Sequence, residues 1–130
     1  MLNGIIPSSW QPQLHAALRI VSGLLFLEHG TSKLFHWPTS MGDQPLPTLF
    51  LIAGLIETVG GLMVTVGFYT RIAAFFMAGE MAAAYFMAHL PNSFFPMANQ
   101  GEAAILFCFI FLFLASAGAG PYSVDDSRKS

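Results

Sequence analysis

Four long apolar segments, separated by short polar or proline-rich stretches, make up most of this 130-residue chain. Prolines stand at positions 7, 12, 38, 45, 47, 91, 96 and 121, outside the interiors of the long apolar runs. Because proline disfavours a helix interior and restricts the residue before it, the stretches between prolines are the candidate helices. The pattern predicts four helices, over residues 14–35, 47–66, 69–90 and 100–118.

Each predicted helix is long enough to cross a membrane, since about 20 residues at ~1.5 Å per residue span a ~30 Å hydrocarbon core. The composition favours lipid as the solvent. Only 9% of the residues are charged and 55% are hydrophobic, whereas a soluble domain carries about 25% charged residues. The apolar runs also lack the broad charged face of a surface helix. We therefore predict an all-α membrane protein, a four-transmembrane-helix bundle with short loops in contact with the lipid bilayer.

The rest of the chain is divided among connectors and two terminal segments. Short connectors are expected at 36–46, 67–70 and 91–99. An N-terminal segment, 1–13, precedes the membrane domain, 14–120, and a polar C-terminal tail, 121–130, follows it. The last six residues of the tail, DDSRKS (125–130), are expected to be frayed. Residues 1–13 contain no Lys or Arg, and no small-x-small cleavage site follows the first apolar run, so the first helix is predicted to be retained rather than cleaved as a signal peptide.

The few basic residues indicate an orientation. With four spans, both termini lie on one side, and Lys33 falls near the other side. Because cytoplasmic loops are enriched in Lys and Arg, the excess on the terminal side predicts cytoplasmic termini. No basic run suggests a nucleic-acid partner. The basic residues near the terminal side are Arg19, Arg71, Arg128 and Lys129.

Every predicted helix carries one glutamate, and two of these lie near the middle of their spans. A charge at the bilayer centre costs about 2.5–3.5 kcal/mol on insertion scales. Glu57 and Glu80 must therefore be paired, protonated or turned toward a polar cavity, and they are the candidate proton carriers. The other two glutamates, Glu28 and Glu102, lie nearer span ends.

The first helix concentrates its polarity in one stripe with a 4-3 spacing, which places it on one helix face. Such a stripe should face the bundle interior or a water-filled crevice. With cytoplasmic termini, the polar residues that fall in the outer half predict an outward-opening polar pocket floored by Glu57 and Glu80. These outer-half residues are Glu28, His29, Lys33, His36, His89 and Glu102. The stripe is His15, Arg19, Ser22, Phe26, His29, Lys33 and His36. The binding-pocket candidates are Arg19, Glu28, His29, Lys33, Arg71, His89 and Glu102.

Plainer interpretations stand beside these. The acids also fit a structural role, in which each pairs with Lys33, Arg71, Arg19 or a backbone group and fixes helix register. No H-x-x-x-H pair occurs within one helix, and three of the four histidines lie near span ends, so no metal site is predicted. The single cysteine, Cys108, cannot form an internal disulfide and is expected to pack as a small apolar side chain.

Four segments of the chain form an ordered set of motifs: RIVSGLLFLEHGTSKL (19–34), ETVGGLMVTVGFYTR (57–71), GE (101–102) and GAGPYSVD (118–125). This set resembles the DoxX family of small bacterial membrane proteins, over about residues 14–126. The resemblance implies four helices in a bacterial inner membrane and directs attention to Arg19, Lys33, Glu57, Arg71 and Glu102. The family name derives from a resemblance to a subunit of a thiosulfate:quinone oxidoreductase.

Three functional hypotheses follow. The first is a redox-associated, quinone-linked membrane subunit, with Glu57 and Glu80 as proton carriers and Lys33 and His29 as contacts for the quinone head. It would work with an oxidoreductase partner protein or as a homo-oligomer, since the chain has no complete catalytic motif of its own. The second is a structural membrane scaffold, and the third is a small proton-coupled carrier.

Overall fold

The computed structural model describes residues 4–40 and 47–128, and in these ranges it is helical without a strand. Residues 41–46 of the first connector, and Lys129, which was counted in the orientation, lie outside the described residues. The helices are α1 (Gln11–Phe35), α2 (Thr48–Val66), α3 (Thr70–Ala84), α4 (Pro96–Asn99), α5 (Glu102–Ala117) and α6 (Val124–Ser127), with 3-10 turns at Ser8–Trp10 and Leu90–Asn92 and a π-helix at Tyr85–His89.

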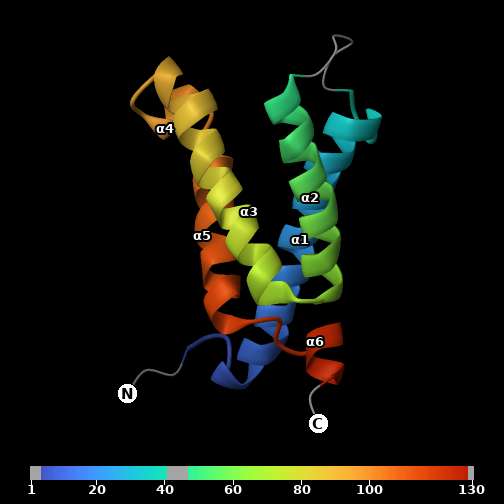
Figure 1. Cartoon of the computed structure of the whole chain (residues 1–130). Coiled ribbons are helices and arrows are strands. Elements are labelled where there is room, and N and C mark those ends of the chain that lie inside the picture. The colour runs from blue at the N-terminus through green and yellow to red at the C-terminus, as the bar shows by residue number, and fades with distance from the viewer. Residues whose placement is uncertain (1–3, 41–46, 129–130) are drawn as a thin grey trace.

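The long helices pack as two pairs, α1 with α2 and α3 with α5, and α2 joins the pairs by packing on α3. Figure 1 shows the start of α1, the α2–α3 turn and α6 at one end of the molecule, called here the α6 end. The two pairs lie close together at the α6 end and diverge toward the opposite end, where α4 lies. The polar stripe of α1 follows this arrangement: Arg19, Ser22 and Phe26 are buried, whereas His29 and His36 are exposed.

Glycines set the close contact between α1 and α2. A Cβ built on Gly30 would lie 2.4 Å from the backbone nitrogen of Thr58, and one on Gly61 would lie 2.9 Å from the Cα of Leu27. Only glycine allows the two backbones to come this close. The contact therefore fixes the register of α1 against α2, which decides which polar side chains of the two helices meet.

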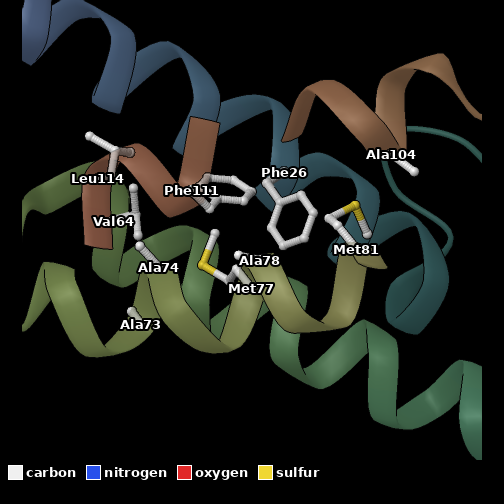
Figure 2. Close-up of a cluster of buried hydrophobic side chains, with 10 residues drawn as sticks. All are labelled: Phe26, Val64, Ala73, Ala74, Met77, Ala78, Met81, Ala104, Phe111 and Leu114. Carbon is white, nitrogen blue, oxygen red and sulfur yellow. The ribbon is translucent and has the colours of Figure 1, made fainter. Parts of the chain in front are cut away.

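The buried core lies between α3, α5 and the inner faces of α1 and α2 (Figure 2). Phe26 of α1 meets Phe111 of α5 with ring centroids 4.8 Å apart, and Met77 of α3 packs between them and α2, where Gly60 leaves room for its sulfur. Many large apolar side chains instead point outward and are exposed, which suits a lipid solvent. Examples are Leu24, Leu55, Phe76, Leu106 and Phe109.

Two helical segments are long and apolar enough to cross a membrane, judged by length and composition: Thr48–Val66 and Thr70–Asn92. The second includes the π-helix and the 3-10 turn that continue α3. Of the other two, α5 is apolar but has 16 residues, and α1 has 25 residues and carries Arg19, Glu28 and Lys33. Helix α1 begins before the predicted residue 14 because Pro12 stands in its first turn, where proline needs no hydrogen bond to its nitrogen.

The expectation of a frayed end is wrong for residues 125–128, because the described part of the C-terminal segment contains α6. Ser123 begins α6, and its side-chain oxygen accepts a hydrogen bond from the Asp126 nitrogen at 3.0 Å. The Asp125 nitrogen donates to the Gly67 oxygen in the α2–α3 turn at 2.8 Å. This segment therefore closes the α6 end of the bundle instead of hanging free.

Candidate functional site

An ion pair joins α1 to α2 in the interior. Lys33 Nζ lies 2.6 Å from Glu57 Oε1, and the two side chains are 13% and 2% exposed. Lys33 also lies over the Phe50 ring, 5.3 Å from its centroid. The register set by Gly30 produces this pairing, because it places Lys33, about one turn further along α1, beside the turn of α2 that holds Gly54 and Glu57.

Glu80 of α3 completes the cluster. Its carboxyl lies close enough to interact with the carboxyl of Glu57 and with the charge of Lys33. Its Oε1 is buried and has no hydrogen-bond partner among the described residues. Two ionised acids beside one cation would leave a net negative charge in the interior, which a low dielectric disfavours. Three helices thus bring one cation and two acids together, and this group is called the Lys33–Glu57–Glu80 cluster below.

Arg19 is completely buried near the α6 end and has a different set of partners. Its guanidinium donates to the backbone oxygen of Ala119, to that of Pro121 at 3.1 Å and to that of Tyr122 at 2.7 Å. It also interacts with the charge of Asp125. Arg19 therefore anchors the C-terminal segment to α1 rather than lining an outward-facing pocket.

Asp125 caps the start of α3 from the C-terminal segment. Its two carboxylate oxygens accept from the Tyr69 and Thr70 nitrogens at 2.8 and 2.9 Å. Burial disfavours the charged form, but the hydrogen bonds from Thr70 and Tyr69 and the positive charge of Arg128 outweigh it, so the pKa of Asp125 is lowered. A carboxylate at a helix N-terminus is also stabilised by the helix dipole.

Replacing Asp125 with Ala is expected to cost about 0.5–2 kcal/mol of stability at neutral pH, the usual effect of losing a helix cap. Because the folded-state pKa is below the unfolded value of about 3.9, the cap stabilises fully above that pH and loses its effect as the pH falls through the folded-state value. Thermal unfolding in detergent from pH 7 down to about 3 checks this. Asp125→Asn, which keeps an acceptor without charge, should be intermediate, and a wild-type advantage that grows below about pH 4 would contradict the assignment.

Arg71 is exposed, and its side chain lies at the C-terminus of α5. Its guanidinium donates to the carbonyl oxygens that end α5, those of Ala115, Ser116 and Ala117. These carbonyls have no partner inside the helix, and a cation there also complements the helix dipole. Gly118 lets the guanidinium lie against the backbone, since a Cβ there would be 3.1 Å from one of its nitrogens.

The remaining pocket candidates are dispersed. Glu28 is exposed on α1, and Glu102 is exposed in the first turn of α5, where the helix dipole favours an acid. His89 Nδ1 pairs with the Asn99 oxygen at 3.0 Å. The His29 ring stands edge-on to Phe107 with centroids 6.1 Å apart. The structure thus joins Lys33, Glu57 and Glu80, and it separates Arg19 and Arg71 from them.

Two functional features of the structure were not predicted. From the sequence, Asp125 is placed only in the polar tail, although this residue ends the GAGPYSVD motif. The glycine-rich run before Asp125 is the one sequence feature that could have indicated its role. Asn99 is buried and holds the turn before α5, donating to the Tyr85 hydroxyl at 3.1 Å and accepting from the Gly101 nitrogen at 2.7 Å. An isolated asparagine in a loop gives no comparable signal.

The sequence model of the DoxX family matches residues 14–90, which is more than half of the chain. The chain belongs to the DoxX family. All three residues of the Lys33–Glu57–Glu80 cluster lie within the matched region, whereas the C-terminal segment held by Arg19 lies beyond it. The identification supports membrane localisation and contact with the lipid bilayer.

Two relatives extend the similarity over nearly the whole of this DoxX-family chain. A Haemophilus influenzae protein, described as an uncharacterized protein, is 42% identical over 127 residues, covering 90% of this chain and 92% of its own. A Mycobacterium tuberculosis protein, described as an uncharacterized membrane protein, is 28% identical over 149 residues, covering 95% and 91%. No solved structure matches the chain.

Proposed function

We propose that this DoxX-family protein is a redox-associated, quinone-linked subunit of the bacterial inner membrane in which the Lys33–Glu57–Glu80 cluster exchanges protons. The observation that carries the proposal is the Glu80 carboxyl, placed beside an already formed ion pair with one oxygen buried and unpartnered. With one cation and two acids, the cluster is neutral only when one acid is protonated. A neutral cluster is the stable state in a low-dielectric interior.

The two acids have different roles in this proposal. Glu57 is 1% exposed and bound to Lys33, so it acts as the fixed counter-ion. Glu80 is half-buried and makes no direct ion pair with the residues that the structure describes, so it takes up and releases the proton. Loss of that proton creates a net negative charge, which Lys33 stabilises by attraction. Lys33 thereby keeps the proton exchangeable instead of permanently bound.

The residues around the cluster fit the head of a quinone. His29 is exposed one turn before Lys33 on α1 and offers a polar nitrogen, while Phe107 provides an aromatic wall beside it. Such a head requires a few directed hydrogen bonds in an apolar setting. When bound, a quinone would accept two electrons, supplied by a partner oxidoreductase, together with two protons. In this arrangement His29 orients the head and Glu80 supplies a proton.

Replacing Glu80 with Gln is expected to slow quinone reduction about 100-fold or more, the usual contribution of a positioned acid or base. The amide keeps the shape but carries no exchangeable acidic proton. The rate of quinone reduction in membrane vesicles, together with native mass spectrometry for quinone bound to protein extracted from its own membrane, measures the effect. Glu28→Gln, the same change on an exposed acid of α1, is the matched control and should keep the wild-type rate.

The outcomes separate the alternatives. A full rate in Glu80→Gln with unchanged quinone content would favour a structural scaffold, which the direct Lys33–Glu57 pair also supports. Absence of quinone from the wild-type protein, together with proton release on adding lipophilic cations, would favour a small proton-coupled carrier. Either result contradicts the redox proposal.

We also propose four membrane crossings, by α1, α2, the segment Thr70–Asn92 and α5, with both termini in the cytoplasm. The outward-facing apolar side chains on all four support this arrangement. At ~1.5 Å per residue, α5 gives about 24 Å, close to the core thickness once its apolar flanks are added. The positive residues Arg19, Arg71 and Arg128 at the α6 end support cytoplasmic termini.

Cysteine labelling in whole cells tests the topology. In a background with Cys108 replaced by Ala, Ser40→Cys is expected to react with a membrane-impermeant maleimide from outside, because Ser40 is exposed at the end opposite α6. Ser127→Cys, which is exposed in α6, should react only after the cells are opened. Labelling of both positions in intact cells would place them on the same side of the membrane and would contradict the three crossings proposed between them.

A further inference from the structure

A cavity of about 480 Å³ lies at the α6 end, between the start of α3, the end of α5 and the C-terminal segment. Its walls include His15, Tyr69, Arg71, Gly118, Asp125 and Asp126. It is separate from the Lys33–Glu57–Glu80 cluster, and the proposed function makes no use of it. Ordered backbone surrounds it, because Arg71 binds the end of α5 and Asp125 binds the start of α3.

The walls carry charges of both signs. The exposed Arg71 guanidinium is held by α5 carbonyls through its two terminal nitrogens, and arginine has five N–H donors, so donors remain to bind an anion. Asp125 is already occupied at the α3 terminus. Asp126 is exposed, contributes a second carboxylate to the cavity and attracts a cation. A ligand with a single charge would satisfy one wall and be repelled by the other.

With the four crossings proposed above, on which this step rests, the α6 end lies at a membrane surface, and a lipid is the ligand available there. Aromatic side chains that combine an apolar ring with a polar group gather at membrane–water interfaces. At the α6 end Trp10, Tyr69 and Tyr122 are all exposed, and Tyr69 itself lines the cavity. The cavity therefore lies at the level of the lipid head groups, where phosphate and ammonium groups are both concentrated.

We propose that this cavity binds the head group of a zwitterionic phospholipid, with its phosphate at Arg71 and its ammonium at Asp126. The planar guanidinium suits a phosphate, to which it can donate two parallel hydrogen bonds. The carboxylate suits an ammonium group, which only donates. Asp125 and Asp126 together disfavour an anionic lipid, whose head group would bring a negative charge without a cation.

Native mass spectrometry of the full chain in mild detergent, titrated with phosphatidylethanolamine or phosphatidylglycerol, tests the proposal. The wild-type protein is expected to retain phosphatidylethanolamine in preference. Arg71→Gln and Asp126→Asn should each weaken it about tenfold or more, the effect of losing a charge-assisted hydrogen bond. Glu102→Gln, a charge removal on an exposed acid at the opposite end of the molecule, is the control and should change nothing.

A further variant and a competition experiment separate lipid binding from a loss of stability and from binding of a free head group. Because Arg71 also caps α5, Ala117→Leu fills the cavity without touching a charge, and it should abolish retention with an unchanged melting temperature. Soluble phosphoethanolamine should compete weakly if the acyl chains contribute and strongly if a free head group is the true ligand. Equal retention of both lipids, or retention unaffected by Asp126→Asn and Ala117→Leu, would overturn the proposal.

Discussion

Replacing Arg19 with Ala is expected to be among the most damaging single changes in this protein, at a cost of about 3–5 kcal/mol. The guanidinium is completely buried and donates to the carbonyl oxygens of Ala119, Pro121 and Tyr122. Each acceptor left unsatisfied costs about 1–3 kcal/mol, and the vacated volume adds a cavity cost. Since a folded domain is stable by only about 5–15 kcal/mol, the C-terminal segment should detach or the whole chain unfold.

Thermal unfolding in detergent and limited proteolysis of the C-terminal segment measure this effect. The melting temperature of Arg19→Lys should be intermediate. A lysine ammonium keeps the positive charge, but it lacks the planar arrangement of N–H donors with which the guanidinium reaches three carbonyl oxygens. Arg128→Ala is the control at the same end. It removes exposed contacts over the Phe68 and Tyr69 rings, each worth about 0.5–1 kcal/mol. A melting temperature for Arg19→Ala equal to that of Arg128→Ala would contradict the anchoring role.

The partners of Arg19 show where sequence reasoning reaches its limit. The Arg19 motif and the GAGPYSVD motif were both recognised as marks of the family, but their contact spans about a hundred residues. The acceptors are backbone carbonyl oxygens, which every residue type provides. The residue types at positions 119–122 therefore do not identify these positions as hydrogen-bond acceptors for Arg19. The sequence accordingly gives no sign that a buried arginine holds the backbone at 119–122, directly before the polar residues expected to fray.

The acids illustrate the opposite case. The cost of a charge in lipid was enough to single out Glu57 and Glu80, and the structure pairs Glu57 with Lys33 and places Glu80 beside them. Which base would pair with which acid was left open between Lys33, Arg71 and Arg19, because that choice depends on helix register. Close contact at Gly30 and Gly61 sets the register and selects Lys33 for Glu57. Small residues were visible in the sequence, but their pairing across two helices was not.

The predicted stripe on α1 holds for part of its length. It is buried from Arg19 to Phe26 and loses its cover at His29 and His36, because the helix pairs diverge toward the α4 end (Figure 1). The periodicity of a sequence shows which side chains share one face of a helix. It does not show the angle at which the α3–α5 pair packs against that face of α1. The exposure of His29 beside Phe107 is what makes it available to a ligand in the proposed function.

Replacing Lys33 with Met is expected to be nearly as damaging as the loss of Arg19, at about 3–5 kcal/mol, because it leaves the buried Glu57 without its cation. Adding Glu57→Leu should restore most of the lost stability, since well-packed apolar residues often replace a buried ion pair without cost or with a gain. Thermal unfolding of the two single variants and the double variant gives the coupling between the positions. Independent, additive effects would show that the pair contributes little.

The same double variant separates proton exchange from scaffolding, because it removes the charges while keeping the fold. If the cluster exists to fix helix register, a stable Lys33→Met/Glu57→Leu protein should function as the wild type does. If Glu80 exchanges a proton against the charge of Lys33, the stable double variant should fail in quinone reduction as completely as Glu80→Gln does. Activity would then be lost while stability is largely kept, a separation that a purely structural ion pair does not allow.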